Sequence, residues 1–255
     1  MTRVNETVSA RRGEGQSFYL WLAGAFVAIA FGGFLPTYWL PVAAGAFHRP
    51  PIVHIHGLIF FAWTCFYFAQ TALVAAGRTP DHRNWGLAGI ALFSVMICTV
   101  LAAQVAILKL NDQMGFGDQA RRFAAVSLTL LPLFIGIFAL AIAKVRQPQM
   151  HKRLMILVMC MLMQPAIARL FITFLAPAGA SDAGPPSPFV AVPPGLVADL
   201  LVMAAMIYDW RTIGRPHRVY LYGLPLIMAN QLVMVPIAAS AVWMTFARGF
   251  EGLLG

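Results

Sequence analysis

The chain has 255 residues, of which 60% are apolar and 11% charged, and its mean hydropathy is +0.76. Because a typical soluble domain carries roughly a quarter charged residues, this composition excludes a water-soluble globule. The 18 Lys and Arg residues outnumber the 9 Asp and Glu residues, and the formal net charge is +9. In a soluble protein this excess would suggest a nucleic-acid partner, so the placement of the charges decides what it means.

Uncharged runs long enough to cross a bilayer as helices, which takes about 20 apolar residues, recur along the chain. They predict seven spans, at residues 18–40, 52–76, 85–108, 123–143, 154–176, 190–208 and 219–247. The fifth run contains one charge, Arg169, and the sixth contains one, Asp199. The sequence therefore predicts an all-α polytopic transmembrane helical bundle, residues 18–247, between an N-terminal cytoplasmic tail, 1–17, and a short outer tail, 248–255.

The basic residues predict the orientation of this bundle, since cytoplasmic loops are enriched in Lys and Arg. With the N-terminus inside, the inner side collects Arg3, Arg11, Arg12, Arg78, Arg83, Lys144, Arg146, Lys152, Arg153, Arg211, Arg215 and Arg218. The outer side then holds Arg49, Lys109, Arg121, Arg122 and Arg248. This bias predicts an inner N-terminus and an outer C-terminus. The net charge then indicates contact with anionic lipid headgroups on the cytoplasmic face and no nucleic acid.

Three connectors expected on the inner side share a pattern of Pro, His and basic residues. Their histidines are His82, His151 and His217, and each connector ends where a new span begins. If the three side chains converge, they could hold a metal, a cofactor carboxylate or a transferable proton. The alternative is that they are three separate interfacial anchors next to turn-forming prolines.

The motif His54-Ile55-His56-Gly57 and the later motif His82-Arg83-Asn84-Trp85-Gly86 carry a resemblance to known proteins. The stretch around them, roughly a quarter of the chain, resembles uncharacterised bacterial multi-pass membrane proteins and, more loosely, the DUF2306-type membrane proteins. The resemblance implies a membrane location, which we expect to be the bacterial inner membrane, and no established activity.

The two charges inside the spans call for an explanation, because an ionisable group in a bilayer costs at least a few kcal/mol. At 1.5 Å per residue, Arg169 lies ~10 Å and Asp199 ~13 Å below the outer boundary of two consecutive antiparallel spans. A direct ion pair between Arg169 and Asp199 would neutralise both charges, so we expect them to pair.

Other polar side chains are expected in the same outer half of the membrane: His54, His56, Gln104, Gln164, Asn230 and Gln231. Polar groups at one depth suggest a cavity, and the alternative is that they hydrogen-bond between helices. A metal site of His54, His56 and Asp199 would require residues 52–56 to be extended, because helical side chains two residues apart diverge by ~200°.

The sequence thus favours a membrane protein that handles a small ligand or ion, in transport or sensing, and that requires no cofactor. In it, Arg169 would hold an anionic group, Asp199 would orient it, and His54 or His56 would act as a titratable gate. One alternative is a redox protein with haem or copper, suggested by six His and 13 Met. Another is a structural or assembly subunit whose Arg–Asp pair only fixes helix register. No hydrolase motif indicates an enzyme, and ligand identity and oligomeric state stay open.

Overall fold

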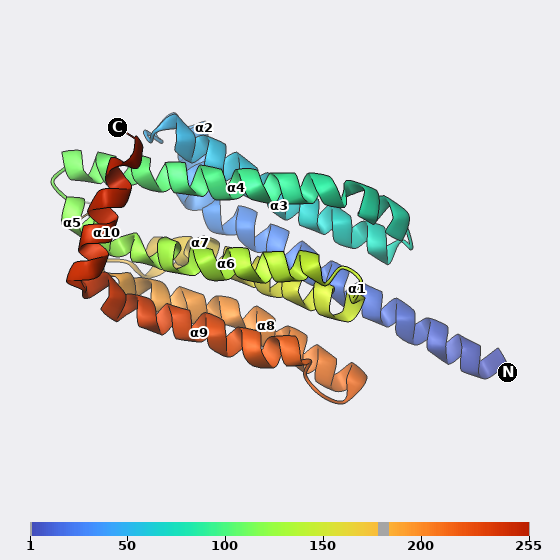
Figure 1. Ribbon diagram of the computed structural model, residues 1–255. Coiled ribbons are helices and arrows are strands. Elements are labelled where there is room, and N and C mark those ends of the chain that lie inside the picture. Colours follow the sequence, from blue (N-terminus) through green and yellow to red (C-terminus); the bar gives the residue numbers. More distant parts are fainter. Residues whose placement is uncertain (1, 178–183, 255) are drawn as a thin grey trace.

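In a bilayer every backbone polar group must be satisfied within the protein, and a helix achieves this within one segment. The computed structural model describes residues 2–177 and 184–254, and that part of the chain is helical almost throughout and contains no strand. Seven of its helical segments are long and apolar enough to cross a membrane. The predicted all-α bundle with seven candidate spans is therefore confirmed, and the chain has the architecture of a multi-pass membrane protein (Figure 1).

The long helices are α1 (Thr2–Phe34), α3 (Pro51–Ala75), α4 (Thr79–Gln113), α6 (Ala125–Ala143), α7 (Pro148–Leu175), α8 (Val192–Ile213) and α9 (Arg218–Ala239). Shorter elements are the π-helix η1 (Leu35–Trp39), α2 (Leu40–Ala43), α5 (Gly117–Phe123), the 3-10 helix η3 (Pro188–Ala191), α10 (Ala241–Glu251) and the 3-10 helix η4 (Gly252–Leu254).

Helix α7 is the central helix of the bundle. It packs against α1, α6, α8 and α9, and 56% of its most apolar window is buried, against 28% to 44% for the other spans. The polar side chains on the buried face of α7, Arg153 and Gln164, are therefore removed from lipid.

Both predicted limits of the bundle differ from those in the structure. Helix α1 already begins at Thr2, so most of the predicted tail 1–17 continues the first helix beyond the bundle (Figure 1). The predicted span 219–247 breaks at Ser240, whose hydroxyl accepts a 3.1 Å hydrogen bond from the backbone N–H of Trp243 and so caps α10. Because of this break, α10 lies across the end of the bundle instead of completing the last span (Figure 1).

The connectors 76–78, 144–147 and 214–217 lie at one end of the bundle, together with the first half of α1 (Figure 1). We call this the basic end, because most Lys and Arg residues of the connectors are found there. The opposite end, where α5 and α10 lie, is called the α10 end.

Candidate functional site

Arg169 and Asp199 do not form the predicted ion pair. The Arg169 side chain is exposed, and its guanidinium lies over the Phe34 ring, 5.7 Å from the ring centroid. Asp199 is 4% exposed, and among the described residues no basic side chain forms an ion pair with it. Similar depth in the membrane was not sufficient for an ion pair. Arg169 is five residues beyond the buried Gln164 and therefore points ~140° away from it around α7.

Asp199 instead interacts with Gln231 of α9. The two side chains share a hydrogen bond, while Asp199 Oδ2 and Gln231 Oε1 are buried and have no hydrogen-bond partner among the residues that the structure describes. Since the amide nitrogen is the donor of a glutamine side chain, Gln231 is the donor and the Asp199 carboxylate is the acceptor. Two buried acceptor oxygens are therefore left without a donor.

Gly195, one turn before Asp199 on α8, makes room for Gln231. A Cβ at position 195 would lie 2.9 Å from Gln231 Cδ, which is too close for an ordinary contact. Gln164 of α7 is buried nearby and donates through Nε2 to the carbonyl oxygen of Ala191, 3.0 Å away. We call Gln164, Asp199 and Gln231 the Asp199 layer.

A second polar group lies between the same helices at the basic end. Arg153 donates through Nε to Asp209 Oδ2 at 2.8 Å and through Nη2 to Asp209 Oδ1 at 2.5 Å. Its Nη1 donates to the backbone and side-chain oxygens of Gln149 at 2.8 and 2.7 Å. The backbone N–H of His217 completes the shell of Asp209 at 3.2 Å. This group is satisfied and buried, and it ties α7 to α8 and to the α8–α9 connector.

The Asp199 layer and the group of Arg153 and Asp209, which we call the basic-end layer, are in register across three helices. Gln164 follows Arg153 by eleven residues on α7, Gln231 follows Tyr220 by eleven on α9, and Asp199 precedes Asp209 by ten on α8. At 1.5 Å per residue the layers are ~15–17 Å apart along the helices. Tyr220 is fully buried at the basic-end layer, and within the described ranges its hydroxyl has no partner.

His54 and His56 do not form a metal site with Asp199. Both lie on helix α3, which begins at Pro51, so residues 52–56 are not extended as that site requires. His54 Nδ1 is 3.2 Å from the Tyr38 hydroxyl, and His56 Nδ1 is 3.4 Å from the Thr99 hydroxyl. In the described part of the chain, no group of three His, Cys, Asp or Glu residues is placed to hold a metal ion.

The remaining predicted residues pair between neighbouring helices. Gln104 Oε1 accepts from the Ser127 hydroxyl at 3.2 Å, and Asn230 Nδ2 donates to the carbonyl oxygen of Thr129 at 3.0 Å. The hollow lined by Phe31, Gly32, Leu35 and Trp39 and the hollow at the α8–α9 connector contain none of the residues of the predicted outer cavity. Most of the predicted set thus follows the interhelical hydrogen-bonding alternative.

Of the three histidines of the basic connectors, His82 and His151 lie side by side, whereas His217 has a capping role. The rings of His82 and His151 lie 6.3 Å apart between centroids, and His151 Nδ1 is 2.8 Å from the Ala141 carbonyl oxygen. His217 instead caps α9, since its Nδ1 accepts from the backbone N–H of Val219 at 3.2 Å. Burial, and next the positive charge of Arg153, lower the pKa of His217 below its usual value.

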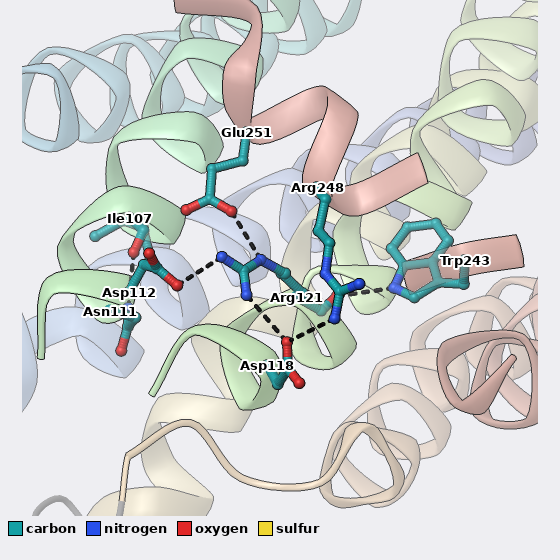
Figure 2. A network of polar contacts seen from close by, with 8 residues as sticks. All are labelled: Ile107, Asn111, Asp112, Asp118, Arg121, Trp243, Arg248 and Glu251. Atoms are coloured by element: carbon teal, nitrogen blue, oxygen red, sulfur yellow. Dashed lines mark hydrogen bonds and ion pairs between the residues drawn. The ribbon is translucent and has the colours of Figure 1, made fainter. Parts of the chain in front are cut away.

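A cluster around Arg121, at the α10 end, was not predicted (Figure 2). Arg121 contacts Asp112 at 2.6 Å, Asp118 at 3.0 Å and Glu251 at 2.8 Å, and its carbonyl oxygen accepts from Trp243 Nε1 at 2.8 Å. The nearness of two acidic residues in sequence was an available signal. The contact with Glu251 spans 130 residues and could not be inferred.

The fold and these buried polar layers define a multi-pass integral membrane protein with ionisable groups inside its bundle. No family model matches the chain, and comparisons with curated proteins and with solved structures also find no match.

Proposed function

We propose that the protein handles a proton, in transport or sensing, at Asp199 inside the bundle. The observation that carries the proposal is the pair of buried oxygens, Asp199 Oδ2 and Gln231 Oε1, that have no donor. Polar atoms in a bilayer core are usually hydrogen-bonded, because leaving one unsatisfied costs several kcal/mol.

A single proton would supply the missing donor. Bound to Asp199 Oδ2, it would neutralise a charge that is costly at this depth, and it could donate to Gln231 Oε1. Together with the hydrogen bond that Gln231 donates to the Asp199 carboxylate, this makes a two-bonded ring between a carboxylic acid and an amide. Loss of the proton leaves two acceptors without a donor, so protonation is coupled to the packing of α8 against α9.

We also propose that the N-terminus lies on the inner side of a bacterial inner membrane. In this orientation the basic end contacts anionic lipid headgroups. The positive-inside rule supports it. The likeness to DUF2306-type proteins stays a prediction. Arg169, exposed over Phe34, has no part in the Asp199 site.

The test is infrared difference spectroscopy of the purified protein in nanodiscs, comparing acidic with alkaline buffer. We expect a band of a protonated carboxylic acid that disappears in Asp199→Asn and persists in the control Asp118→Asn, whose carboxylate is exposed and ion-paired. Asn imitates the protonated acid, so the variant should fold. A band unchanged in Asp199→Asn, or an Asp199 that is ionised throughout, would overturn the proposal.

Proton flux into liposomes containing the protein then separates the two roles. Under an imposed pH gradient, flux that Asp199→Asn abolishes and Asp118→Asn retains indicates transport. A titrating Asp199 without flux indicates a proton sensor.

A further inference from the structure

We propose that the α8–α9 connector forms a binding site for the headgroup phosphate of an anionic phospholipid. A hollow of about 510 Å³ lies at this connector, lined by Ile213, Arg215, Pro216, His217, Arg218 and Leu221. The inference rests on the proposed contact of the basic end with anionic headgroups, to which it assigns one site. It is independent of proton binding at Asp199.

The hollow carries positive charge that no carboxylate neutralises. Arg215 and Arg218 are exposed, and within the described part of the chain neither forms an ion pair. The carboxylate nearest in sequence, Asp209, is fully buried and is engaged by Arg153. The contact of Arg218 Nη2 with Met150 Sδ, at 3.8 Å, leaves the guanidinium charge uncompensated.

The local backbone fixes these arginines at the mouth of the hollow. Helix α8 ends at Ile213 and is capped by Gly214, which adopts a φ of +75° and donates its N–H to the carbonyl oxygen of Trp210. A left-handed conformation of this kind favours glycine, which has no Cβ. After Pro216, the cap by His217 starts α9 at Arg218. The turn therefore places Arg215 and Arg218 on either side of a short rigid segment.

Apolar side chains of the same hollow favour a lipid over a free anion. Ile213 and Leu221, at the end of α8 and the start of α9, are 53% and 49% exposed. At the basic end, helices that cross the membrane pass from hydrocarbon into water, where a phospholipid presents phosphate beside its acyl chains. Guanidinium groups bind phosphate strongly, and the two apolar side chains suit the first part of an acyl chain.

The experiment measures binding of phosphatidylglycerol and of phosphatidylcholine to the delipidated, detergent-solubilised full-length protein by native mass spectrometry. The test variant is Arg215→Gln/Arg218→Gln, and the matched control is Lys144→Gln/Arg146→Gln, which removes two charges from another connector at the same end. We expect the test variant to bind phosphatidylglycerol about thirtyfold more weakly. The control should bind it like the unmodified protein.

Each other outcome overturns a distinct statement. Equal losses in both variants would mean a diffuse electrostatic contact and would overturn the site alone. No preference of the unmodified protein for phosphatidylglycerol would overturn the headgroup contact as well. Competition by inorganic phosphate at concentrations similar to those of the lipid would make this a free-anion site. Asp199→Asn should bind the lipid normally, so failure of the proton proposal leaves this result unaffected.

Discussion

Arg153 and Asp209 form a two-point ion pair inside the protein, with 3% and 0% of their side chains exposed. The pair joins the central helix α7 to α8 across 56 residues of sequence. Burying two charges is offset only when geometry is good and the remaining polar atoms are satisfied, and here Gln149 and the His217 backbone complete the shell.

Removing one partner should therefore be strongly destabilising. Arg153→Met leaves a buried carboxylate without its cation, and we expect a loss of about 3–5 kcal/mol in the free energy of unfolding. The measurement is denaturant or thermal unfolding of the purified protein in one detergent. Replacing both partners, in Arg153→Met/Asp209→Leu, should restore much of this loss. As a control, Arg78→Met removes an exposed pair with Asp81 and should cost about 0–1 kcal/mol. Equal losses in Arg153→Met and Arg78→Met would contradict the argument.

Adjacent glycines on α1 should respond in opposite directions to alanine. A Cβ at Gly33 would lie 2.7 Å from the backbone carbonyl carbon of Ala166, so α1 and α7 would have to move apart. We expect Gly33→Ala to lower the unfolding free energy by about 1–3 kcal/mol. Gly32 has nothing within 4 Å of its Cβ position, and Gly32→Ala should raise stability by about 0.5–1 kcal/mol. Unfolding curves for the two variants test this, and a common sign would refute the close approach.

Helix α10 should depend on Glu251 for its position. The contact between Arg121 Nε and Glu251 Oε2 is largely buried, with 13% and 12% of the side chains exposed. Glu251→Gln removes its charge, and we expect α10 to open more readily by about 1–3 kcal/mol. Hydrogen exchange of the α10 backbone amides measures this opening. Arg248→Gln, which removes the exposed contact with Asp118, is the matched control and should change exchange little.

Stability should fall at acidic pH because of His217. Its lowered pKa means that the unfolded chain, with a value near 6.5, binds a proton before the folded protein does. The unfolding free energy then rises with pH in this range, so the contribution of His217 to stability is lost as pH falls below about 6.5.

His217→Asn keeps a capping side chain but removes the titration. The difference in unfolding free energy, unmodified protein minus variant, should decrease as the pH is lowered from about 7 to about 5. A difference that is constant or that increases over this range would exclude His217 as the titrating group.

Composition was sufficient to predict the class of fold. Seven apolar runs separated by polar connectors can satisfy their backbone in a bilayer only as helices, so the number of spans followed from sequence. The ends of the bundle did not follow, because Ser240 interrupts a run that remains apolar beyond it.

Depth along a span could be counted from the sequence, but rotation about the helix axis could not. In a soluble helix the apolar stripe shows which face is buried, whereas lipid tails are as apolar as the protein core and leave no such stripe. The sequence therefore identified Asp199, Gln164 and Gln231 as polar residues inside the membrane. The predicted ion pair of Arg169 with Asp199 was wrong, because Arg169 lies on another face of α7. Only packing decided that Asp199 meets Gln231 and that Arg153, assigned to an inner connector, is buried against Asp209.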